Sequence, residues 1–411
     1  MPGKDPGCFG LNAKRNPCRT RCKMLLRAVF HRLHFQPVGR IVPLLFSPMA
    51  RENDPIPYPP SPETISSIRE HLSHWFQENA RDYPWRRTRD PYAILVSELM
   101  LQQTQITTVL ERGYYKRWME RFPDWKTLSS ASESSILKAW EGLGYYNRAR
   151  NLQRTARSVI LDHGGEFPRE AEVARGLPGI GPYTAGAVLS LAYGIPEPAV
   201  DGNVSRVLSR LFLVEEAINS STGQKQLWEL ARALVSPDDP GGHNSALMEL
   251  GQSHCRPSNP KCPTCPLEKD CSAFKLELID RFPIKKPPPP VLEREEFVLL
   301  IRRAGRLYLV PETGNRRKGL WRLPEVAPGA VTDQAELCRL VYPITRYRVL
   351  LRAFEAPPNW KAPEEGAPGG WFAEGNPESL PPLGAPYRKV LELSRGMQES
   401  FDLNPWEPPD K

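Results

Sequence analysis

Length and composition already limit what this protein can be. Its 411 residues suffice for two or three domains of about 150 residues each. With 40% hydrophobic and 25% charged residues, the chain can bury a sizeable core, which excludes wholesale disorder. No apolar run approaches the roughly 18 residues of a membrane helix, so a membrane-spanning protein is excluded. The 45 prolines predict long, extended connecting segments.

The net charge of +8 comes from the first 48 residues. They hold nine Lys or Arg and one Asp, and removing these from the totals of 55 and 47 leaves 46 basic and 46 acidic residues. Overall charge therefore does not indicate a nucleic-acid partner. Any such indication has to come from local sites.

Residues 1–60 comprise this basic leader and a proline-rich lead-in (DPIPYPPSP), and we expect them to be disordered. The amphipathic stretch MLLRAVFHRLHF, residues 24–35, is typical of an organelle transit peptide. The alternative is that translation starts at Met49. We expect an intracellular protein of a bacterial cytoplasm or nucleoid, or a mitochondrial or nuclear protein if the leader is a transit peptide.

Residues 61–281 have an almost wholly helical pattern. Apolar residues recur every three or four positions, and the pattern breaks at glycine and proline. We predict a bundle of about ten helices, the first of which begins near Ser61.

The helix predicted over residues 93–105 (AILVSELMLQQTQ) is apolar nearly all round. Its polar exceptions, Glu98, Gln102 and Gln105, are spaced along one face. An apolar surround raises the pKa of a carboxyl group, which makes Glu98 a candidate proton donor. The alternative is the solvated face of a surface helix, which the flanking apolar residues disfavour.

Three further motifs follow in the helical region. In GLGYYNRAR, residues 142–150, Tyr145 and Arg148 could supply base stacking and a phosphate contact, although an aromatic pair in a helical protein is more often core. In LPGIGPYTA, Gly179 and Gly181 allow a tight turn whose free N–H groups, at the start of a helix, can bind a phosphate. Asp201 then opens a helix in DGNV, where an N-cap carboxylate is held ionised by adjacent N–H groups.

Four of the eight cysteines form one cluster. Cys255, Cys262, Cys265 and Cys271 stand at C-x6-C-x2-C-x5-C, and four thiolates at such spacing suit zinc or an iron–sulfur cluster. The spacing alone does not choose between them. A secreted disulfide scaffold would be shorter and more evenly rich in cysteine.

A proline-rich linker, residues 282–293, separates the helical region from residues 294–400, where short strands dominate. We predict strands at 297–302, 307–311, 346–354 and 370–372, with Ala304-Gly305 as a hairpin signal, and helices at 332–341 and 387–394. These residues form an α+β domain, followed by a tail at 401–411.

Taken together, SELMLQQTQ around Glu98, GLGYYNRARNL, LPGIGPYTAGA, VDGNVSRVL and the cysteine loop resemble the adenine DNA glycosylases of the MutY type, in the helix–hairpin–helix glycosylase superfamily. The resemblance is strong over residues 83–271. A weaker one over 294–395 is to the family's Nudix-like domain. The stronger resemblance implies a mainly α catalytic bundle with a 4Fe–4S cluster on the four cysteines. The weaker one implies a C-terminal α+β Nudix-like domain.

The same resemblance implies roles for individual residues. Glu98 would protonate the adenine and Asp201 would stabilise the sugar cation, supported by Asn203 and Tyr183. The remaining implied sites are an adenine pocket of Trp85, Arg86, Leu101 and Ser245, and DNA contacts from Gln102, Gln103, Tyr145, Arg148, Gly179 and Gly181.

Two departures from the family pattern stand out. Ser245 occupies a position where Gln or Glu commonly touches the adenine, which would loosen base selectivity. The Phe-Ser-His signature of the lesion-reading loop is replaced by a segment containing Thr345, Arg346 and Tyr347, and we assign lesion recognition to these three. The second domain also lacks the Nudix hydrolase pattern REx2EE, so we expect it to bind and not to hydrolyse.

The resulting expectation is a monomeric, monofunctional glycosylase that removes adenine paired with 8-oxoguanine or guanine in duplex DNA, with no membrane partner. One alternative is an endonuclease III-like glycosylase on oxidised pyrimidines, which is disfavoured because that enzyme has a catalytic lysine at the position of Tyr183. Another is a catalytically silent damage-binding protein, which the Glu98–Asp201 pair disfavours.

Overall fold

In the computed structural model, residues 59–314, 317–357, 360–361, 368–375 and 379–395 are described. The leader, most of the lead-in and the tail lie outside them, as do the predictions made for those segments. All the described residues belong to one compact unit, which begins at Ala50. Within the described part of the chain, no helix is long and apolar enough to cross a membrane.

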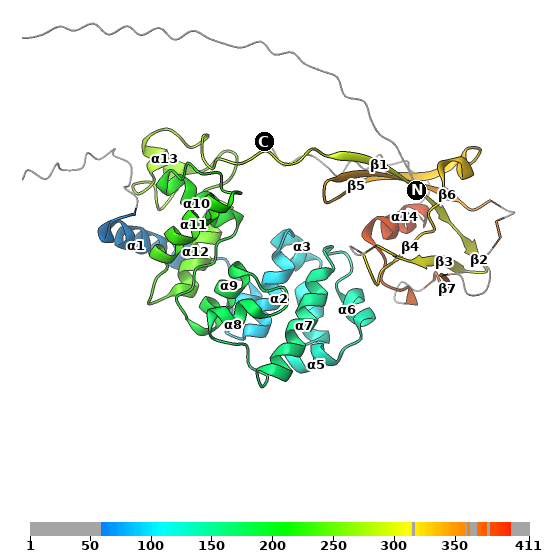
Figure 1. The fold of residues 1–411 in the computed structure, drawn as a ribbon, viewed down its shortest axis with the longest axis horizontal. Helices are drawn as coiled ribbons and strands as arrows, with labels where there is room; N and C mark the ends of the chain where they lie inside the picture. Colours follow the sequence, from blue (N-terminus) through cyan, green and yellow to red (C-terminus); the bar gives the residue numbers. More distant parts are fainter. Residues whose placement is uncertain (1–58, 315–316, 358–359, 362–367, 376–378, 396–411) are drawn as a thin grey trace, which may run out of the picture. The chain divides into compact units, whose positions relative to one another are not determined.

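The helical region lies between Pro62 and Lys275 (Figure 1). Its elements are α1 (Pro62–Asn79), η1 (Pro84–Arg86), α2 (Pro91–Leu101), α3 (Ile106–Glu111), α4 (Tyr114–Arg121), α5 (Trp125–Ser130), α6 (Glu133–Ala139), α7 (Asn147–Asp162), α8 (Ala171–Gly176), α9 (Pro182–Tyr193), α10 (Gly202–Phe212), α11 (Ser221–Leu234), α12 (Pro240–Ser253), η2 (Cys262–Thr264) and α13 (Ser272–Lys275).

Side-chain caps begin many of these helices. Ser61 accepts a hydrogen bond from the Thr64 N–H, which confirms the predicted start of α1, and Asp90 caps α2 in the same way. Such caps satisfy N–H groups that have no partner inside the helix. The starts are therefore determined by residues close in sequence.

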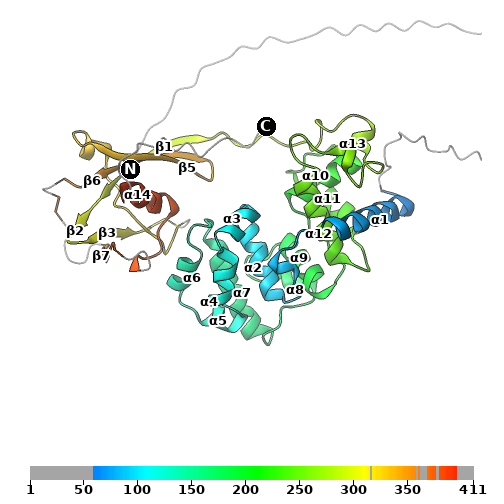
Figure 2. The same ribbon diagram turned by 180° about the vertical axis from the view of Figure 1, so that it is seen from behind.

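Two apolar cores hold the bundle together. One gathers side chains from α2, α4, α7 and α9, including Leu95, Trp118 and Val188. The other gathers side chains from α1, α10, α11 and α12, including Leu72 and Leu208. Helix α9 packs against both α2 and α12, and the three helices are seen side by side in the view from behind (Figure 2). The bundle thus has a boundary between its two cores, where α9 packs against α12.

The C-terminal residues form an α+β domain, as predicted. Its elements are β1 (Leu292–Leu300), β2 (Arg302–Arg303), β3 (Arg306–Pro311), β4 (Trp321–Arg322), η3 (Pro328–Val331), β5 (Glu336–Ile344), β6 (Tyr347–Glu355), β7 (Gly370–Ala373) and α14 (Ala385–Arg395). One sheet has the order β1-β6-β5, with β1 parallel and β5 antiparallel to β6. The other has the order β2-β3-β4, with β7 also paired to β3.

The predicted hairpin at Ala304-Gly305 is confirmed. Both residues have positive φ, at 48° and 71°, and they join Arg303 to its cross-strand partner Arg306. Strand β1 begins at Leu292, inside the predicted linker, and ends before Ile301 instead of continuing to the hairpin.

The helix predicted over residues 332–341 is wrong. Residues from Glu336 onward form β5, in which Leu340 pairs with Leu351 of β6. A short mixed segment with a few apolar residues fits either period, so pairing with β6, the next strand of the hairpin, decided its conformation.

Several contacts join the C-terminal domain to the start of α7. The Tyr146 hydroxyl donates to the Leu383 carbonyl at 3.3 Å, and the Leu383 N–H donates to Glu141 Oε1 at 2.9 Å. Leu320, in the loop before β4, is fully buried with the side chains of the first helical core. The two domains therefore share packing and are not joined by the linker alone.

Candidate active site

Glu98 is a buried carboxylic acid on α2. It is 5% exposed, and every residue of α2 between Tyr92 and Met100 is buried. This excludes the solvated-face alternative. Burial raises the pKa of Glu98 to about 7, and the charge of Asp201 adds to the rise. A hydrogen bond from the Tyr183 hydroxyl to Oε2, at 2.5 Å, and the charge of Arg86 oppose it. Glu98 can therefore carry a proton near neutral pH.

Asp201 is the N-cap of α10, as its sequence context predicts. Its Oδ1 accepts from the Val204 N–H at 2.7 Å and its Oδ2 from the Asn203 side-chain amide at 2.8 Å. Burial raises the pKa of Asp201, and the two donors oppose this rise by favouring the carboxylate. The sequence predicts an ionised cap but does not reveal this effect of burial. The two carboxyl groups therefore lie in different surroundings, since only Asp201 accepts backbone and amide N–H donors.

The site lies at the boundary between the two helical cores. Glu98 on α2 and Tyr183 in the first turn of α9 come from the side of the first core, and Asp201 at the start of α10 comes from the second. Met248 of α12 completes the meeting point, with its sulfur 3.5 Å from the Tyr183 hydroxyl. Two carboxyl groups about a hundred positions apart in sequence are brought together in this way.

The predicted pocket residues have distinct surroundings. Trp85 and Ser245 are buried, and Leu101 is half-buried at the end of α2. Arg86 donates to Oε2 of the buried Glu249 at 2.5 Å and thereby ties η1 to α12. Sequence reasoning missed Glu249, although its place in the apolar helix one turn after Ser245 was an available signal.

The predicted 93–105 helix is too long. It ends at Leu101, so Gln102 is its C-cap and Gln105 is the N-cap of α3, which means that the expected polar face is not continuous. Gln102 lies toward α9, 3.4 Å from the Thr184 hydroxyl. Gln103 is exposed in the intervening turn, and Tyr145 is 60% exposed, so Tyr145 is not a core residue.

Arg148 does not lie where a phosphate could reach it. Its side chain is 8% exposed, and its guanidinium donates to backbone carbonyl groups at the end of α2 and in the turn before α7. The expected direct DNA contact from Arg148 is therefore wrong in this structure.

The tight turn predicted in LPGIGPYTA, which is the hairpin between two helices, lies between α8 and α9. Gly179 has φ 78°, and a Cβ there would lie 2.4 Å from the Asn151 amide nitrogen, so only glycine fits. Gly181 is the N-cap of α9, with ordinary φ and open space where a Cβ would be. Because Gly181 supplies no side-chain cap, the first N–H groups of α9 have no capping oxygen from this residue, and an anion could satisfy them.

The four clustered cysteines lie in the loop after α12 and are all free thiols. Among the described residues, no three or more His, Cys, Asp or Glu side chains are grouped to hold one metal ion. The donor set nevertheless fits a cluster cofactor chemically, since four thiols share one loop and Arg210 donates to the Cys255 sulfur at 3.5 Å.

A buried arginine that sequence reasoning missed connects this loop to Asp201. Arg206 donates to the Cys255 carbonyl at 2.7 Å and to the Asn203 amide oxygen at 3.0 Å. Asn203 in turn donates to Asp201. A cavity of about 330 Å³ lies beside Asn203 and Arg206.

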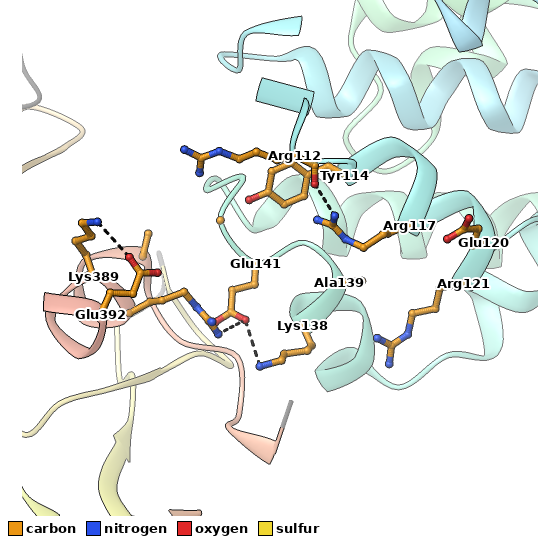
Figure 3. Close-up of a pocket in the computed structure, with 13 residues that line it drawn as sticks. Arg112, Tyr114, Arg117, Glu120, Arg121, Lys138, Ala139, Glu141, Lys389 and Glu392 are labelled. Atoms are coloured by element: carbon orange, nitrogen blue, oxygen red, sulfur yellow. Dashed lines mark hydrogen bonds and ion pairs between the residues drawn. The ribbon is translucent and has the colours of Figure 1, made fainter. Parts of the chain in front are cut away.

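A larger cavity, of about 980 Å³, lies elsewhere (Figure 3). It is bordered by residues of α4, α6 and α14, and Lys138 and Glu141 point toward each other at its edge, 3.3 Å apart. None of the predicted site residues lines it, so we do not assign the site to it.

Thr345 and Arg346 form the two-residue turn between β5 and β6, which pair up to Ile344 and Tyr347. Thr345 has φ 53°, a strained conformation for a β-branched residue. The Arg346 guanidinium lies 5.5 Å from the Tyr347 ring centroid. The three residues predicted to read the lesion thus share one hairpin tip.

Comparisons with known proteins show the family of this chain. A family model described as "HhH-GPD superfamily base excision DNA repair protein" matches residues 96–233, which include Glu98, the hairpin and Asp201. Adenine DNA glycosylase of Buchnera aphidicola subsp. Schizaphis graminum is 32% identical over 63% of this chain and 74% of its own length. The chain belongs to the adenine DNA glycosylase family.

Human adenine DNA glycosylase is 45% identical over 218 residues, which cover 51% of this chain and 40% of that protein. The match to the mammalian relatives thus spans less than half of their length. Among solved structures, a thermostable thymine-DNA glycosylase is similar with 34% identity and a TM-score of 0.48, over 52% of this chain and 98% of that one.

Proposed function

We propose that this protein hydrolyses the N-glycosidic bond of adenine paired with 8-oxoguanine or guanine in duplex DNA. The observation that carries the proposal is that two carboxyl groups share the site. Burial raises the pKa of Glu98 to about 7, whereas the carboxyl group of Asp201 accepts hydrogen bonds from N–H groups. Two carboxyl groups in different surroundings can serve as an acid and as a carboxylate in one reaction.

In the proposed mechanism, the target adenine leaves the base stack and enters the site, because its glycosidic bond is not accessible inside the duplex. Protonated Glu98 donates its proton to the adenine ring, so that the base departs as a neutral molecule. The ionised Asp201 stabilises the positive charge on the sugar, and Asn203 keeps Oδ2 in place. Water then adds to the sugar carbon and gives up a proton to a carboxylate, leaving an abasic site.

The side chain hydrogen-bonded to Glu98 is the phenol of Tyr183. A phenol cannot form a Schiff base with the opened sugar, whereas an amine can. This supports a monofunctional glycosylase that leaves the DNA strand intact.

We further propose that Cys255, Cys262, Cys265 and Cys271 hold a 4Fe–4S cluster. A cluster bound there would link the ends of the loop, and Arg206 connects that loop to Asn203 and Asp201. In this proposal the cluster has a structural role, and the proton transfers are carried out by Glu98 and Asp201.

Duplex DNA is the proposed partner. The N-terminus of α9 at Gly181 supports a phosphate contact, and the exposed Gln103 and Tyr145 support insertion into the duplex. The hairpin tip at Thr345, Arg346 and Tyr347 would read the base opposite the adenine, within a domain that we propose is Nudix-like.

The deciding experiment is an excision assay on duplexes with adenine opposite each of 8-oxoguanine, guanine, cytosine and thymine, with and without alkali. We expect excision opposite 8-oxoguanine and guanine, seen as strand breaks only after alkali. Direct strand cleavage at oxidised pyrimidines would instead indicate an endonuclease III-like enzyme. Binding without excision would indicate a silent damage-binding protein.

A further inference from the structure

One buried guanidinium joins two turns that are distant in sequence. Arg148, in the first turn of α7, donates from Nη1 to three carbonyl groups at the end of α2 and from Nη2 to two carbonyl groups in the turn before α7. These acceptors are the carbonyl oxygens of Leu99 (2.6 Å), Met100 (3.0 Å), Gln102 (2.5 Å), Leu143 (2.9 Å) and Gly144 (3.2 Å). Five acceptors on one side chain fix the separation of the two turns.

Each of these turns contains a non-glycine residue in the left-handed region. Gln103 has φ 57° and Tyr145 has φ 46°. This conformation costs free energy for a residue with a Cβ, so it persists only where the surroundings enforce it. Both side chains are exposed, although Tyr145 carries a large aromatic ring. The structure thus holds two exposed side chains in strained turns around a common buried cation.

The aromatic surroundings of Arg148 strengthen the connection. Its guanidinium lies 5.4 Å from the Trp140 ring centroid and 5.5 Å from that of Tyr145. The Trp140 indole N–H also donates to the Gly144 carbonyl at 3.1 Å, so this carbonyl is held from two directions. The orientation of the Tyr145 ring is therefore coupled to the position of the guanidinium.

We propose that Arg148 is a positioning residue that fixes the turns carrying Gln103 and Tyr145 as one rigid wedge for extruding the target base. The inference rests on the proposed function, because it assigns the wedge to the base-flipping step of that reaction. A wedge that is rigid before binding does not lose conformational freedom when it enters the duplex. Removal of Arg148 should therefore impair extrusion and leave the chemistry at Glu98 intact.

A phosphate contact makes different predictions. Removing a cation that neutralises one phosphate reduces the slope of log affinity against log salt concentration by about one. The Nη1 and Nη2 donors of Arg148 are committed to carbonyl groups inside the protein and its Nε is buried, so loss of Arg148 should leave the slope of log affinity against log salt unchanged.

The test compares the wild type with Arg148→Met and Arg148→Lys, using Arg157→Met as the matched control. Lys keeps the charge but presents one ammonium group, which cannot span five acceptors in two turns. Arg157 lies on the same helix and is exposed, with a hydrogen bond to the Ser129 carbonyl. Extrusion is measured by the fluorescence of 2-aminopurine at the target position. Single-turnover excision is measured on an adenine paired with 8-oxoguanine in a fully matched duplex and on the same pair flanked by thymine–thymine mismatches, which weaken its stacking.

We expect both Arg148 variants to lose at least about tenfold in extrusion and in excision of adenine from the fully matched duplex, as for a lost hydrogen bond to a charged group. Excision from the mismatch-flanked duplex should stay near the wild-type rate, and Arg157→Met should behave as wild type. Arg148→Lys serves alone if Arg148→Met does not fold.

Equal losses on both substrates, undiminished extrusion or a reduced salt slope would each overturn the inference. The failure of the proposed function is recognised separately, as a wild-type protein that excises adenine from neither duplex. In that case the fluorescence comparison still decides whether Arg148 supports extrusion.

Discussion

The hydroxyl of Tyr183 donates a hydrogen bond of 2.5 Å to Oε2 of Glu98. The neutral phenol thus contacts the Glu98 carboxyl group, whose protonated form burial favours. Because a hydrogen bond to the carboxylate favours ionisation, Tyr183 holds the pKa of Glu98 below the value that burial alone would give. Tyr183 therefore adjusts the acid that we propose to protonate the base.

The first prediction concerns this adjustment. Tyr183→Phe removes the hydrogen bond, so the pKa of Glu98 should rise above about 7. The protonated form is the active one, so the alkaline limb of the single-turnover excision rate should move to higher pH. The profile is measured from about pH 5 to about pH 9, which spans the expected limb. Tyr193→Phe, a control on the same helix that loses only a bond to the Phe167 carbonyl, should leave the limb in place. A shift to lower pH would contradict the assignment.

The second prediction is that Glu98→Gln uncouples activity from stability. Excision should fall by at least about 100-fold through loss of the proton donor, while DNA affinity is retained. A near wild-type rate would show that Glu98 is not the acid.

The stability of the same variant should depend on pH. The pKa of Glu98 is raised from 4.5 to about 7 on folding, so the stability that it contributes is fully present below pH 4.5 and is lost as pH rises through 7. Glu98→Gln should therefore gain stability over wild type between these values, by at most about 3 kcal/mol at 1.36 kcal/mol per pKa unit. Thermal unfolding at several pH values measures this gain. The exposed Glu120→Gln should show none.

The third prediction concerns the proposed cluster. The purified full chain should be yellow-brown, with about four iron and four labile sulfide per molecule. Cys265→Ser should lower both, whereas Cys338→Ser, which changes a free thiol in β5, should not. Iron, zinc and sulfide are measured on anaerobically prepared protein. Stoichiometric zinc without iron would overturn the proposal.

The fourth prediction concerns the C-terminal domain. Truncation after Arg281 keeps Glu98, Asp201 and the four cysteines, so adenine should still be excised, with most of the preference for 8-oxoguanine over guanine lost. The truncated protein should also unfold at a lower temperature, because the fully buried Leu320 and the bond from Tyr146 to Leu383 are removed. Unchanged discrimination would show that this domain does not read the lesion.

Arg346→Ala in the full chain tests the hairpin tip itself. A direct hydrogen bond to the lesion would contribute about 1–3 kcal/mol to discrimination, by analogy with base-edge contacts. A phosphate contact would weaken binding to 8-oxoguanine and guanine duplexes equally. Arg339→Ala, in β5 of the same hairpin and paired with Glu336, is the control and should leave discrimination unchanged. Both variants are compared with wild type on the two substrates at one salt concentration.

Much of the helical region was determined by residues close together in the sequence. Ser61 and Asp201 each cap a helix through an N–H group three residues away, and Ala304-Gly305 turns its hairpin through its own positive φ angles. The apolar surroundings of Glu98 could also be predicted from the sequence, because nearly every neighbour on its helix is apolar. Such features depend on local chemistry, so a single sequence contains them.

The tertiary structure decided what depends on distant partners. Helix α2 ends at Leu101, where carbonyl groups accept from Arg148, 49 residues beyond Leu99. Residues from Glu336 form a strand because they pair with β6, which in turn pairs with β1, a strand much earlier in the chain. Arg148 was expected at a phosphate, since the sequence marks an arginine as a cation but does not say which carbonyl groups will surround it. The bond from Tyr183 to Glu98, across 85 residues, likewise exists only because α9 packs directly against α2 within the first helical core.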